Sequence, residues 1–296
     1  MGVIFFFVDG MGIGTSDTHN PLSQGKLTFF QELSGSGSLD INTPSSTSPN
    51  FVYTPVDACL GVEGLPQSGT GQTALFTGIN ASKHLGKHFG PYPHSGIKPF
   101  LEHESIFHKL TEAGLSSAFL NAYPPIFFEH AKRRNRWSCT TLMTKSAGIP
   151  LRTTSHVMDG TAVTAELFGN YWREKLGINL PKRGPKEIAQ IVLDMADEHD
   201  FVLYEYYLTD KAGHDMNPQF ADEILSALDS VIYEILLHNT SHTFLLCSDH
   251  GNIEDLSTKT HTFNAVPLIV SGKNASSFKE CTSIMDIPNA ILNTCK

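Results

Sequence analysis

The stretch GVIFFFVDG at residues 2–10 decides the fold, because six consecutive apolar residues end in an acid and a glycine. Such a continuous run is typical of a strand that is buried on both faces of a parallel sheet. Three later segments share this character: Phe201–Leu208, Phe244–Cys247 and Val266–Val270. Apolar residues at helical spacing predict helices at Ile106–Ala113, Pro185–His199, Phe220–His238 and Ser283–Leu292. Together, these elements predict an α/β fold with a doubly wound, mostly parallel sheet.

Residues 122–184 differ in composition from the rest of the chain. The segment starts with AYPPIFF, carries KRRNRW at 132–137, and shows helix-like patterns at Ser138–Ala147 and Thr161–Lys175. We predict a core formed by residues 1–121 and 185–296, with residues 122–184 inserted as a small cap. At about 60 residues, the cap is below the usual size of an independent domain. The Gly- and Ser-rich segment 35–48 predicts an exposed loop.

The composition limits the classes of function. The chain has 296 residues, 40% of them hydrophobic and 17% charged, so it can bury a core without disulfides. Its formal net charge of −9 argues against broad binding to nucleic acid or to an anionic membrane. Five cysteines without a CxxC pair, the lack of a signal-peptide pattern and the lack of 18 consecutive apolar residues predict a cytoplasmic protein.

Three acids follow predicted strands. Asp9, Asp210 and Asp249 each lie just past the carboxyl end of a strand. Open parallel sheets place their active sites at this edge, because adjacent strand ends bring together residues that are distant in sequence. An acid at a strand end can also be a simple turn former that bonds local amides. The coincidence of three such acids favours a shared cleft.

Histidines accompany these acids in three short motifs. TDKAGHD at 209–215 sets Asp210 four residues before His214, SDHGN at 248–252 joins Asp249 to His250, and THTFNAVP at 260–267 supplies His261. Carboxylate oxygens and neutral imidazole nitrogens bind divalent cations at about 2.0–2.2 Å, whereas one ligand alone binds weakly. A lone histidine is more often a surface or hydrogen-bonded group, but the set as a whole predicts a metal site.

A hydroxyl-rich loop precedes another helical run in GLPQSGTGQTALFTG at 64–78. The pattern places Ser68 near a helix amino terminus, where unpaired amides and the helix dipole favour an anion. Ser68 is therefore a candidate nucleophile that metal coordination would activate. The alternative is a plain helix cap, with Ser68 or Thr70 as the capping residue.

These motifs together resemble the alkaline phosphatase superfamily, most closely its branch of cofactor-independent phosphoglycerate mutases and phosphopentomutases. Ser68 precedes Gly71 by three positions, as the nucleophile of that branch precedes its glycine. The segments 210–214, 249–251 and 261–262 match its Asp-x-x-x-His, Asp-His-Gly and His-Thr motifs. The resemblance covers roughly residues 1–80 and 200–296 and implies an alkaline phosphatase-like fold.

The resemblance also implies two metal ions. One would be bound by Asp210, His214 and His261, and the other by Asp9, Asp249, His250 and the hydroxyl oxygen of Ser68. Oxygen and nitrogen ligands without thiolate suit Mn²⁺ or Zn²⁺. Paired metals would stabilise an in-line displacement at phosphorus, with a phosphoserine at Ser68 as the intermediate.

The chain departs from the branch in three respects. Residue 72 is Gln where the mutases usually have His, their large inserted domain is missing, and their substrate-binding arginines have no counterpart. We expect Arg133, Arg134 and Arg136 of the cap to bind the substrate's remaining anionic group, because guanidinium groups bind phosphate and carboxylate in a bidentate manner. The alternative is a solvated, charged helix face.

The sequence therefore predicts an enzyme that transfers the phosphoryl group of a small phosphorylated metabolite. Hydrolysis is favoured over mutase chemistry, because a mutase must exclude water and a small cap makes that harder. Phosphodiesterase activity stays open, and so does an inactive metal-binding relic of the fold. A sulfatase is excluded, because SGTGQ at 68–72 lacks the Pro and Arg of the sulfatase motif. DGMGIG at 9–14 matches a nucleotide-binding glycine motif only loosely.

Overall fold

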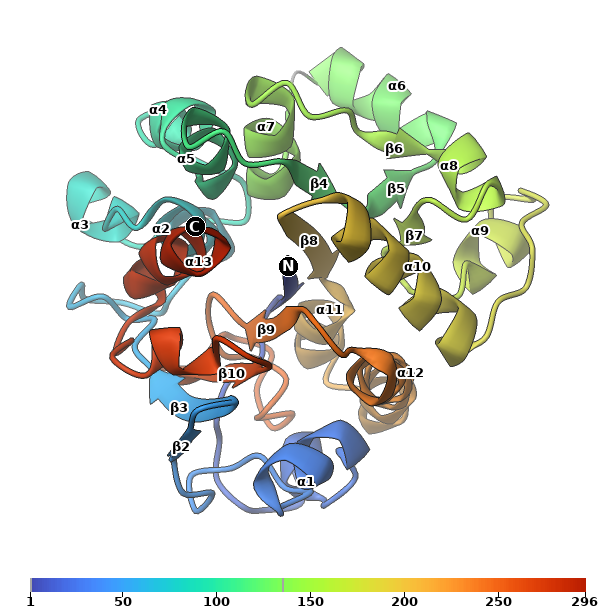
Figure 1. Ribbon diagram of the computed structural model, residues 1–296. Coiled ribbons are helices and arrows are strands. Elements are labelled where there is room, and N and C mark those ends of the chain that lie inside the picture. The colour runs from blue at the N-terminus through green and yellow to red at the C-terminus, as the bar shows by residue number, and fades with distance from the viewer. Residues whose placement is uncertain (1, 135) are drawn as a thin grey trace.

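A computed structural model describes residues 2–134 and 136–296, with the side chain of Arg134 outside the described part. A seven-stranded sheet runs through the molecule in the order β2-β3-β10-β9-β1-β8-β4 (Figure 1). Its strands are β1 (Val3–Val8), β2 (Ser46–Ser48), β3 (Phe51–Val56), β4 (Ser117–Phe119), β8 (Phe201–Tyr206), β9 (Thr243–Cys247) and β10 (Val266–Ser271). The four strands β9, β1, β8 and β4 are mutually parallel. The predicted α/β fold with a large central sheet is confirmed.

The strand at 266–271 runs antiparallel to β9 and to β3, so its predicted parallel direction is wrong. The reason lies in the connection, because residues 248–265 form no crossover helix between β9 and β10. A parallel neighbour needs a long crossover back to the other edge of the sheet. Here the chain turns at the carboxyl edge of β9 and returns beside it. The strand β2 likewise occupies part of the segment 35–48, which was predicted as a loop throughout.

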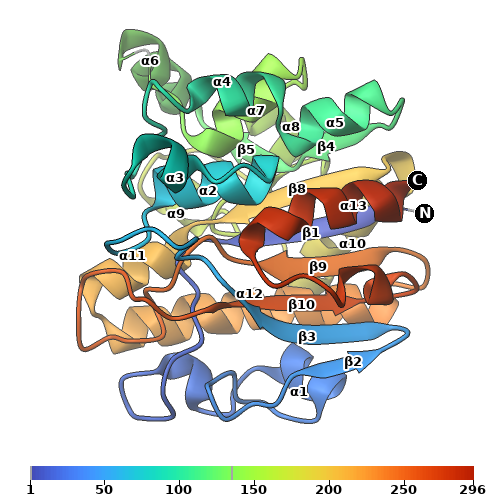
Figure 2. The same cartoon turned by 90° about the vertical axis from the view of Figure 1, so that its left-hand side faces the viewer.

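Helices cover both faces of the sheet (Figure 2). One face packs against α1 (Thr28–Ser34), α10 (Pro185–Glu198) and α12 (Pro218–His238). The other packs against α2 (Ser68–Thr77), α4 (Lys98–His103), α5 (Ile106–Glu112) and α13 (Ile287–Cys295). Shorter elements are α3 (Ala81–Leu85), η1 (Pro21–Ser23), η2 (Ala275–Phe278) and η3 (Ile284–Asp286). None of the helices in the described ranges has the length and apolarity needed to cross a membrane.

The burial of the central strand β1 on both faces accounts for its apolar sequence. Ile4, Phe6 and Val8 of β1 belong to the core on one face of the sheet, whereas Val3, Phe5 and Phe7 belong to the core on the other face. Side chains alternate between the two faces along a strand, so burial of both faces requires an apolar residue at every position. The run VIFFFV therefore fixes β1 in the middle of the sheet.

Most of segment 122–184 forms a small lobe around a second sheet, in the order β6-β5-β7. The lobe comprises β5 (Asn121–Tyr123), β6 (Arg152–Thr153), β7 (Val163–Thr164), α6 (Pro125–Arg134), α8 (Thr154–Met158) and α9 (Asn170–Glu174). Both views show α6 at the end of the molecule opposite β2 and β3 (Figures 1 and 2). Within the segment, α7 (Cys139–Ser146) packs differently, because Cys139 and Met143 are part of the main core beside α4.

Candidate metal centre

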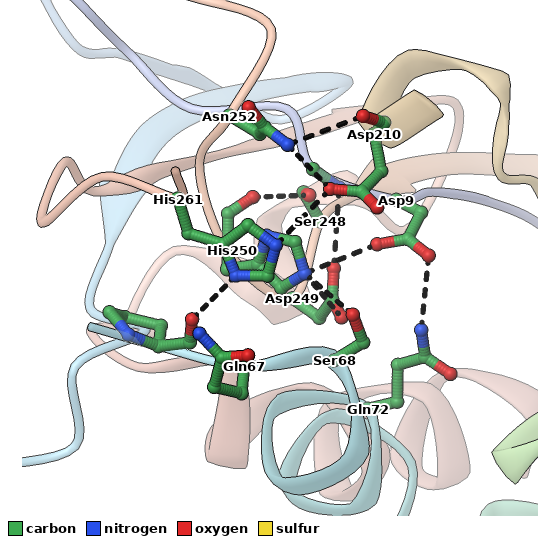
Figure 3. Close-up of polar contacts among 12 residues, drawn as sticks. Asp9, Gln67, Ser68, Gln72, Asp210, Ser248, Asp249, His250, Asn252 and His261 are labelled. Atoms are coloured by element: carbon green, nitrogen blue, oxygen red, sulfur yellow. Dashed lines mark hydrogen bonds and ion pairs between the residues drawn. The ribbon is translucent and has the colours of Figure 1, made fainter. Parts of the chain in front are cut away.

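The three strand-end acids converge at the carboxyl edge of the parallel strands (Figure 3). Asp9 directly follows β1, and Asp249 lies two residues past the end of β9. Asp210 lies in the first turn of α11 (Leu208–Asp215), which begins shortly after β8. The acids meet because β8 and β9 both pair with β1. The structure thus brings together the seven core residues that the sequence singled out: Asp9, Ser68, Asp210, His214, Asp249, His250 and His261.

One group consists of Asp210, His214 and His261, whose ligand atoms lie within 4.8 Å of one another. Asp210 and His214 are four residues apart on α11, so their side chains share one face of the helix. Nε2 of His214 lies 3.4 Å from Oδ2 of Asp210, and Nε2 of His261 lies 3.4 Å from Oδ1. Two imidazole nitrogens therefore face the same carboxylate.

Backbone carbonyls orient both of these rings. Nδ1 of His214 lies 2.6 Å from the carbonyl oxygen of Lys259, and Nδ1 of His261 lies 2.7 Å from that of Pro66. A carbonyl oxygen accepts only, so each Nδ1 carries a proton, and the neutral ring then has its lone pair on Nε2. Metal-binding histidines have this arrangement, with the second ring nitrogen donating to a carbonyl or a carboxylate.

The second group surrounds Nε2 of the fully buried His250. This atom lies 3.0 Å from Oγ of Ser68, 3.3 Å from Oδ1 of Asp9 and 3.5 Å from Oδ2 of Asp249. One ring nitrogen has at most one proton and cannot satisfy three oxygens. Within the described residues, these oxygens of Asp9 and Asp249 are buried without a hydrogen-bond partner. A divalent cation would give both a partner, so the side chains present fit a metal ion.

The two groups adjoin each other. The rings of His250 and His261 stack with centroids 3.8 Å apart and an interplanar angle of 14°. Ligand atoms of Asp9, Asp210 and His250 also lie within 4.8 Å of one another. Such proximity suits a pair of cations, which in two-metal enzymes lie about 3.5–4 Å apart.

Ser68 is the first residue of α2, and its side chain is buried. Gln67 occupies the cap position without a side-chain hydrogen bond, and the hydroxyl of Thr70 donates to the carbonyl of Gln67 at 3.1 Å. Neither hydroxyl is therefore the helix cap. Gly71 allows α2 to approach the loop after β9 that carries Asp249, because a Cβ at position 71 would lie 2.7 Å from the carbonyl oxygen of Asp249. This close approach brings Ser68 to the second group.

Electrostatics of the bare side chains show what a cation would relieve. Burial and the neighbouring carboxylates raise the pKa of Asp9 well above its usual range, and burial raises the pKa of Asp249 to about 7. Burial lowers the pKa of His250 to about 3. Hydrogen bonding to Asp210 raises the pKa of His214 to about 8. Burial alone would raise the pKa of Asp210, but its hydrogen bonds to His214 and His261, together with weaker contacts, lower it. The buried carboxyl groups of Asp9 and Asp249 thus lack a neighbouring positive charge that would stabilise their ionised forms.

Residues without a role in the predicted ligand set orient the ligands. The Gln72 amide donates to Oδ2 of Asp9 at 3.2 Å, and the Asn252 amide donates to Oδ1 of Asp210 at 2.8 Å. Gln72 therefore contacts a candidate ligand from the position where the resembled mutases usually have histidine. Its spacing of four residues from Ser68 on one helix was the available sequence signal.

Glu254 is a second residue that the sequence did not reveal. Its buried carboxylate accepts from the backbone amides of Gly12 and Asn252, from the Thr262 hydroxyl and from the Asn264 amide. It thereby connects the loop after β1 to both parts of the loop between β9 and β10. No local motif marks this role, because its partners include Gly12, which is far away in the sequence, and residues on both sides of Glu254 in the loop.

Glu205 is a further buried acid beside the cluster. It is on β8, and its Oε2 accepts from the Thr140 hydroxyl of α7 at 2.7 Å. Burial raises the pKa of Glu205 to about 7. Sequence reasoning did not identify Glu205 as a site residue, because it lies within a strand whose other residues are all apolar or aromatic.

A cavity of about 620 Å³ opens beside Asp9, Ser68 and Asp210. Asn121 and Tyr123, which lie at the edge of the lobe, are among its lining residues. The predicted substrate-binding arginines Arg133 and Arg136 are not among the residues that line this cavity. Arg133 and Arg136 are exposed, and the Arg136 guanidinium stacks 4.1 Å from the ring centroid of Tyr92, which lines the cavity. The side chain of Arg134 lies outside the described residues.

The fold and this cluster define a class: an alkaline phosphatase-like α/β protein with a candidate two-cation centre at the carboxyl edge of its sheet. A family model described as the metalloenzyme superfamily matches residues 177–296. A 2,3-bisphosphoglycerate-independent phosphoglycerate mutase of Clostridium kluyveri is 28% identical over 123 residues, which are 38% of this chain and 24% of that protein. The matches thus span about a quarter of the length of these curated relatives.

Solved structures show the same fold. The alkaline phosphatase of the Antarctic bacterium TAB5 has a TM-score of 0.60 at 13% identity, over 99% of this chain and 98% of that one. A phosphoglycerate mutase of Leishmania mexicana has a TM-score of 0.51 at 10% identity, over 99% and 95%. These findings confirm the resemblance to the alkaline phosphatase superfamily.

Proposed function

We propose that this protein is a phosphoryl-transfer enzyme that uses two divalent cations, Mn²⁺ or Zn²⁺, and hydrolyses a small phosphomonoester through a phosphoserine at Ser68. The observation that carries the proposal is the convergence of Ser68 Oγ with two orphaned carboxylate oxygens on Nε2 of His250. One cation would be bound by Asp210, His214 and His261. The other would be bound by Asp9, Asp249, His250 and Ser68.

Different residues of the chain would serve as nucleophile, as phosphate-binding group and as supports of the metal ligands. When bound, the cations would lower the pKa of the Ser68 hydroxyl and stabilise the attacking and leaving oxygens. Ser68 Oγ gives up its proton and forms a bond to phosphorus while the bond between phosphorus and the ester oxygen breaks, and the alcohol leaves with a proton. Water then forms a bond to phosphorus, the bond to Oγ breaks, and a proton of that water restores the Ser68 hydroxyl as phosphate is released. The amino terminus of α2, where Ser68 is the first residue, would favour the phosphoryl oxygens through the positive end of the helix dipole. Gln72 and Asn252 hold Asp9 and Asp210 in position.

Two measurements test this proposal. Metal analysis of protein purified without chelator should find about two divalent cations per chain, and p-nitrophenyl phosphate should be hydrolysed. Ser68→Ala should abolish turnover and the acid-stable label from ³²P-substrate, while Ser230→Ala on α12, remote from the site, should retain both. A metal-free protein that stays inactive when Mn²⁺ or Zn²⁺ is supplied would support the alternative of an inactive relic.

Mutase chemistry is the second candidate, favoured by the sequence relatives, which are phosphoglycerate mutases. We favour hydrolysis because the lobe that we propose as the cap is small, and a mutase must protect its phosphoenzyme from water. Incubation with labelled sugar phosphates and phosphoglycerates separates the reactions. Free phosphate indicates a hydrolase and an isomeric phosphate a mutase, and a parallel incubation with bis-p-nitrophenyl phosphate measures phosphodiesterase activity.

A further inference from the structure

The cavity beside the candidate metal centre has a polar floor and aromatic walls. Asp9, Ser68 and Asp210 form the floor, next to the proposed nucleophile. The walls include six aromatic side chains: Tyr92, Tyr123, Phe127, Tyr171, Trp172 and Tyr207. Four of them belong to the lobe or its edge, on β5, α6 and α9. A substrate with its phosphate at Ser68 would therefore extend between aromatic rings.

Several of the side chains that line the cavity are exposed although they are apolar or aromatic. Ile126, Tyr171 and Tyr207 line the cavity with 45%, 56% and 46% of their surface accessible. Together they are three of the eight large hydrophobic side chains that are exposed in the described part of the chain. Exposed apolar groups that gather at a pocket are typical of a ligand site.

One wall contains a stacked aromatic pair. The rings of Tyr123 and Phe127 stack with centroids 4.0 Å apart at 23°. Trp137 packs edge-on against Phe127 at 6.1 Å, and the Lys145 ammonium lies 3.4 Å from the Trp137 ring centroid. These contacts brace the pair, so it is ready to stack on a planar group without reordering.

Charge and size both disfavour a compact, doubly anionic substrate. Of the described side chains that line the cavity, none is a lysine or an arginine, and Glu205 adds a further carboxyl group. A second carboxylate or phosphate on the substrate would thus find only His130 as a possible cationic partner among them, beside the three carboxyl groups of Asp9, Glu205 and Asp210. The volume of about 620 Å³ is within the range of pockets for ligands much larger than a three-carbon acid.

We propose that the natural substrate is a phosphomonoester of an alcohol that carries a flat, uncharged ring system, held between the Tyr123–Phe127 pair and Tyr171. This inference rests on the proposed function and names its substrate class. It replaces a compact acid such as phosphoglycerate with a ring-bearing alcohol. Nucleoside monophosphates and aryl-alkyl phosphates share this chemistry.

The test compares esters whose leaving alcohols differ little in acidity. With the metal-loaded enzyme, kcat/KM should be about 10- to 100-fold higher for 2-naphthylmethyl phosphate than for ethyl phosphate, as expected for stacking on aromatic side chains. For 3-phosphoglycerate it should be lower than for both. A nucleoside 5′-monophosphate in the same series shows whether a base is accepted as the ring.

Variants assign the preference to the walls. Phe127→Ala with Tyr171→Ala should remove most of the naphthyl advantage, because KM for 2-naphthylmethyl phosphate rises much more than KM for ethyl phosphate. Leu237→Ala, which changes an exposed apolar residue on α12, should change neither rate. Equal losses for both esters, or a preference for 3-phosphoglycerate, would overturn the inference.

Failure of the proposed function would look different. Turnover of ethyl phosphate without a ring preference leaves the two-metal chemistry intact and removes only the substrate class. If no ester is turned over, calorimetry with naphthylmethyl phosphonate against ethyl phosphonate decides the matter, and equal affinities would sink the ring preference.

Discussion

The Nε2 atoms of His214 and His261 lie 3.2 Å apart, although the other nitrogen of each ring is directed at a backbone carbonyl. Two neutral rings held in this way would point lone pairs at each other and at Asp210. A cation between them would convert this repulsion into coordination. Replacing either ring should therefore affect metal binding more than folding.

We predict that His261→Ala lowers the metal content from about two to about one divalent cation per chain and lowers kcat by more than 100-fold. In the proposed centre the ring would supply a ligand atom that no neighbouring side chain replaces, and the remaining ligands would bind more weakly. Elemental analysis and kinetics measure the two effects. His238→Ala, an exposed histidine at the end of α12, is the matched control and should retain both cations.

Gln72→Leu should weaken metal binding without removing a ligand. The substitution leaves Oδ2 of Asp9 without its amide donor, and loss of a group that orients a metal ligand typically costs 10- to 100-fold in affinity or activity. Titration of the metal-free protein with Mn²⁺ gives the affinity. Gln190→Leu, whose amide bonds Asp194 on the outside of α10, should bind Mn²⁺ normally. An unchanged affinity in Gln72→Leu would show that this hydrogen bond is dispensable.

Gly71→Ala should damage the site from the backbone. The new Cβ would lie 2.7 Å from the carbonyl oxygen of Asp249, so α2 or the loop must shift. We expect a loss of about 1–3 kcal/mol in stability and a disproportionate loss of activity, because Ser68 moves with the helix. Urea unfolding and kinetics measure these effects. At Gly184 the nearest atom would be 3.8 Å away, so Gly184→Ala should cost little of either.

Stability should depend on pH through Glu205. Its pKa is about 7 in the folded protein and lower in the unfolded chain, so the carboxyl group keeps its proton to a higher pH in the folded state. The free energy of unfolding therefore falls as pH rises from about 4.5 to 7, by roughly 1–3 kcal/mol. Glu205→Gln should flatten this part of the profile in chemical denaturation from pH 5 to 8. Glu112→Gln on the exposed face of α5 should follow the wild-type curve, and an unaltered slope in Glu205→Gln would contradict the assignment.

Much of this architecture could be predicted from local patterns. The apolar run of β1 reports burial on both faces, and the spacing in α10 and α12 reports one buried stripe, so both kinds of element stand out. The acids at strand ends could be expected to meet because parallel neighbours share one edge. The convergence of Asp9 with Asp249 follows from that rule alone.

What escaped prediction depends on long-range pairing. The direction of β10 is set by how the loop 248–265 turns back, and its sequence carries no helix or tight-turn pattern that reveals this. Glu254 and Glu205 are recognisable only through partners that are distant in the sequence, such as Gly12 and Thr140. AYPPIFF at 122–128 supplies Tyr123 and Phe127 of the cavity, but the other aromatic side chains, such as Tyr171 and Tyr207, come from separate elements, so the sequence does not show that they meet.

Glu254 has a consequence for how cations are acquired. Because a carboxylate outside the proposed coordination sphere ties residue 12 to residues 252, 262 and 264, the loop keeps its shape through protein contacts alone. At the proposed centre, a cation would then enter a preformed site, and one ion could be exchanged for another without any refolding of the chain.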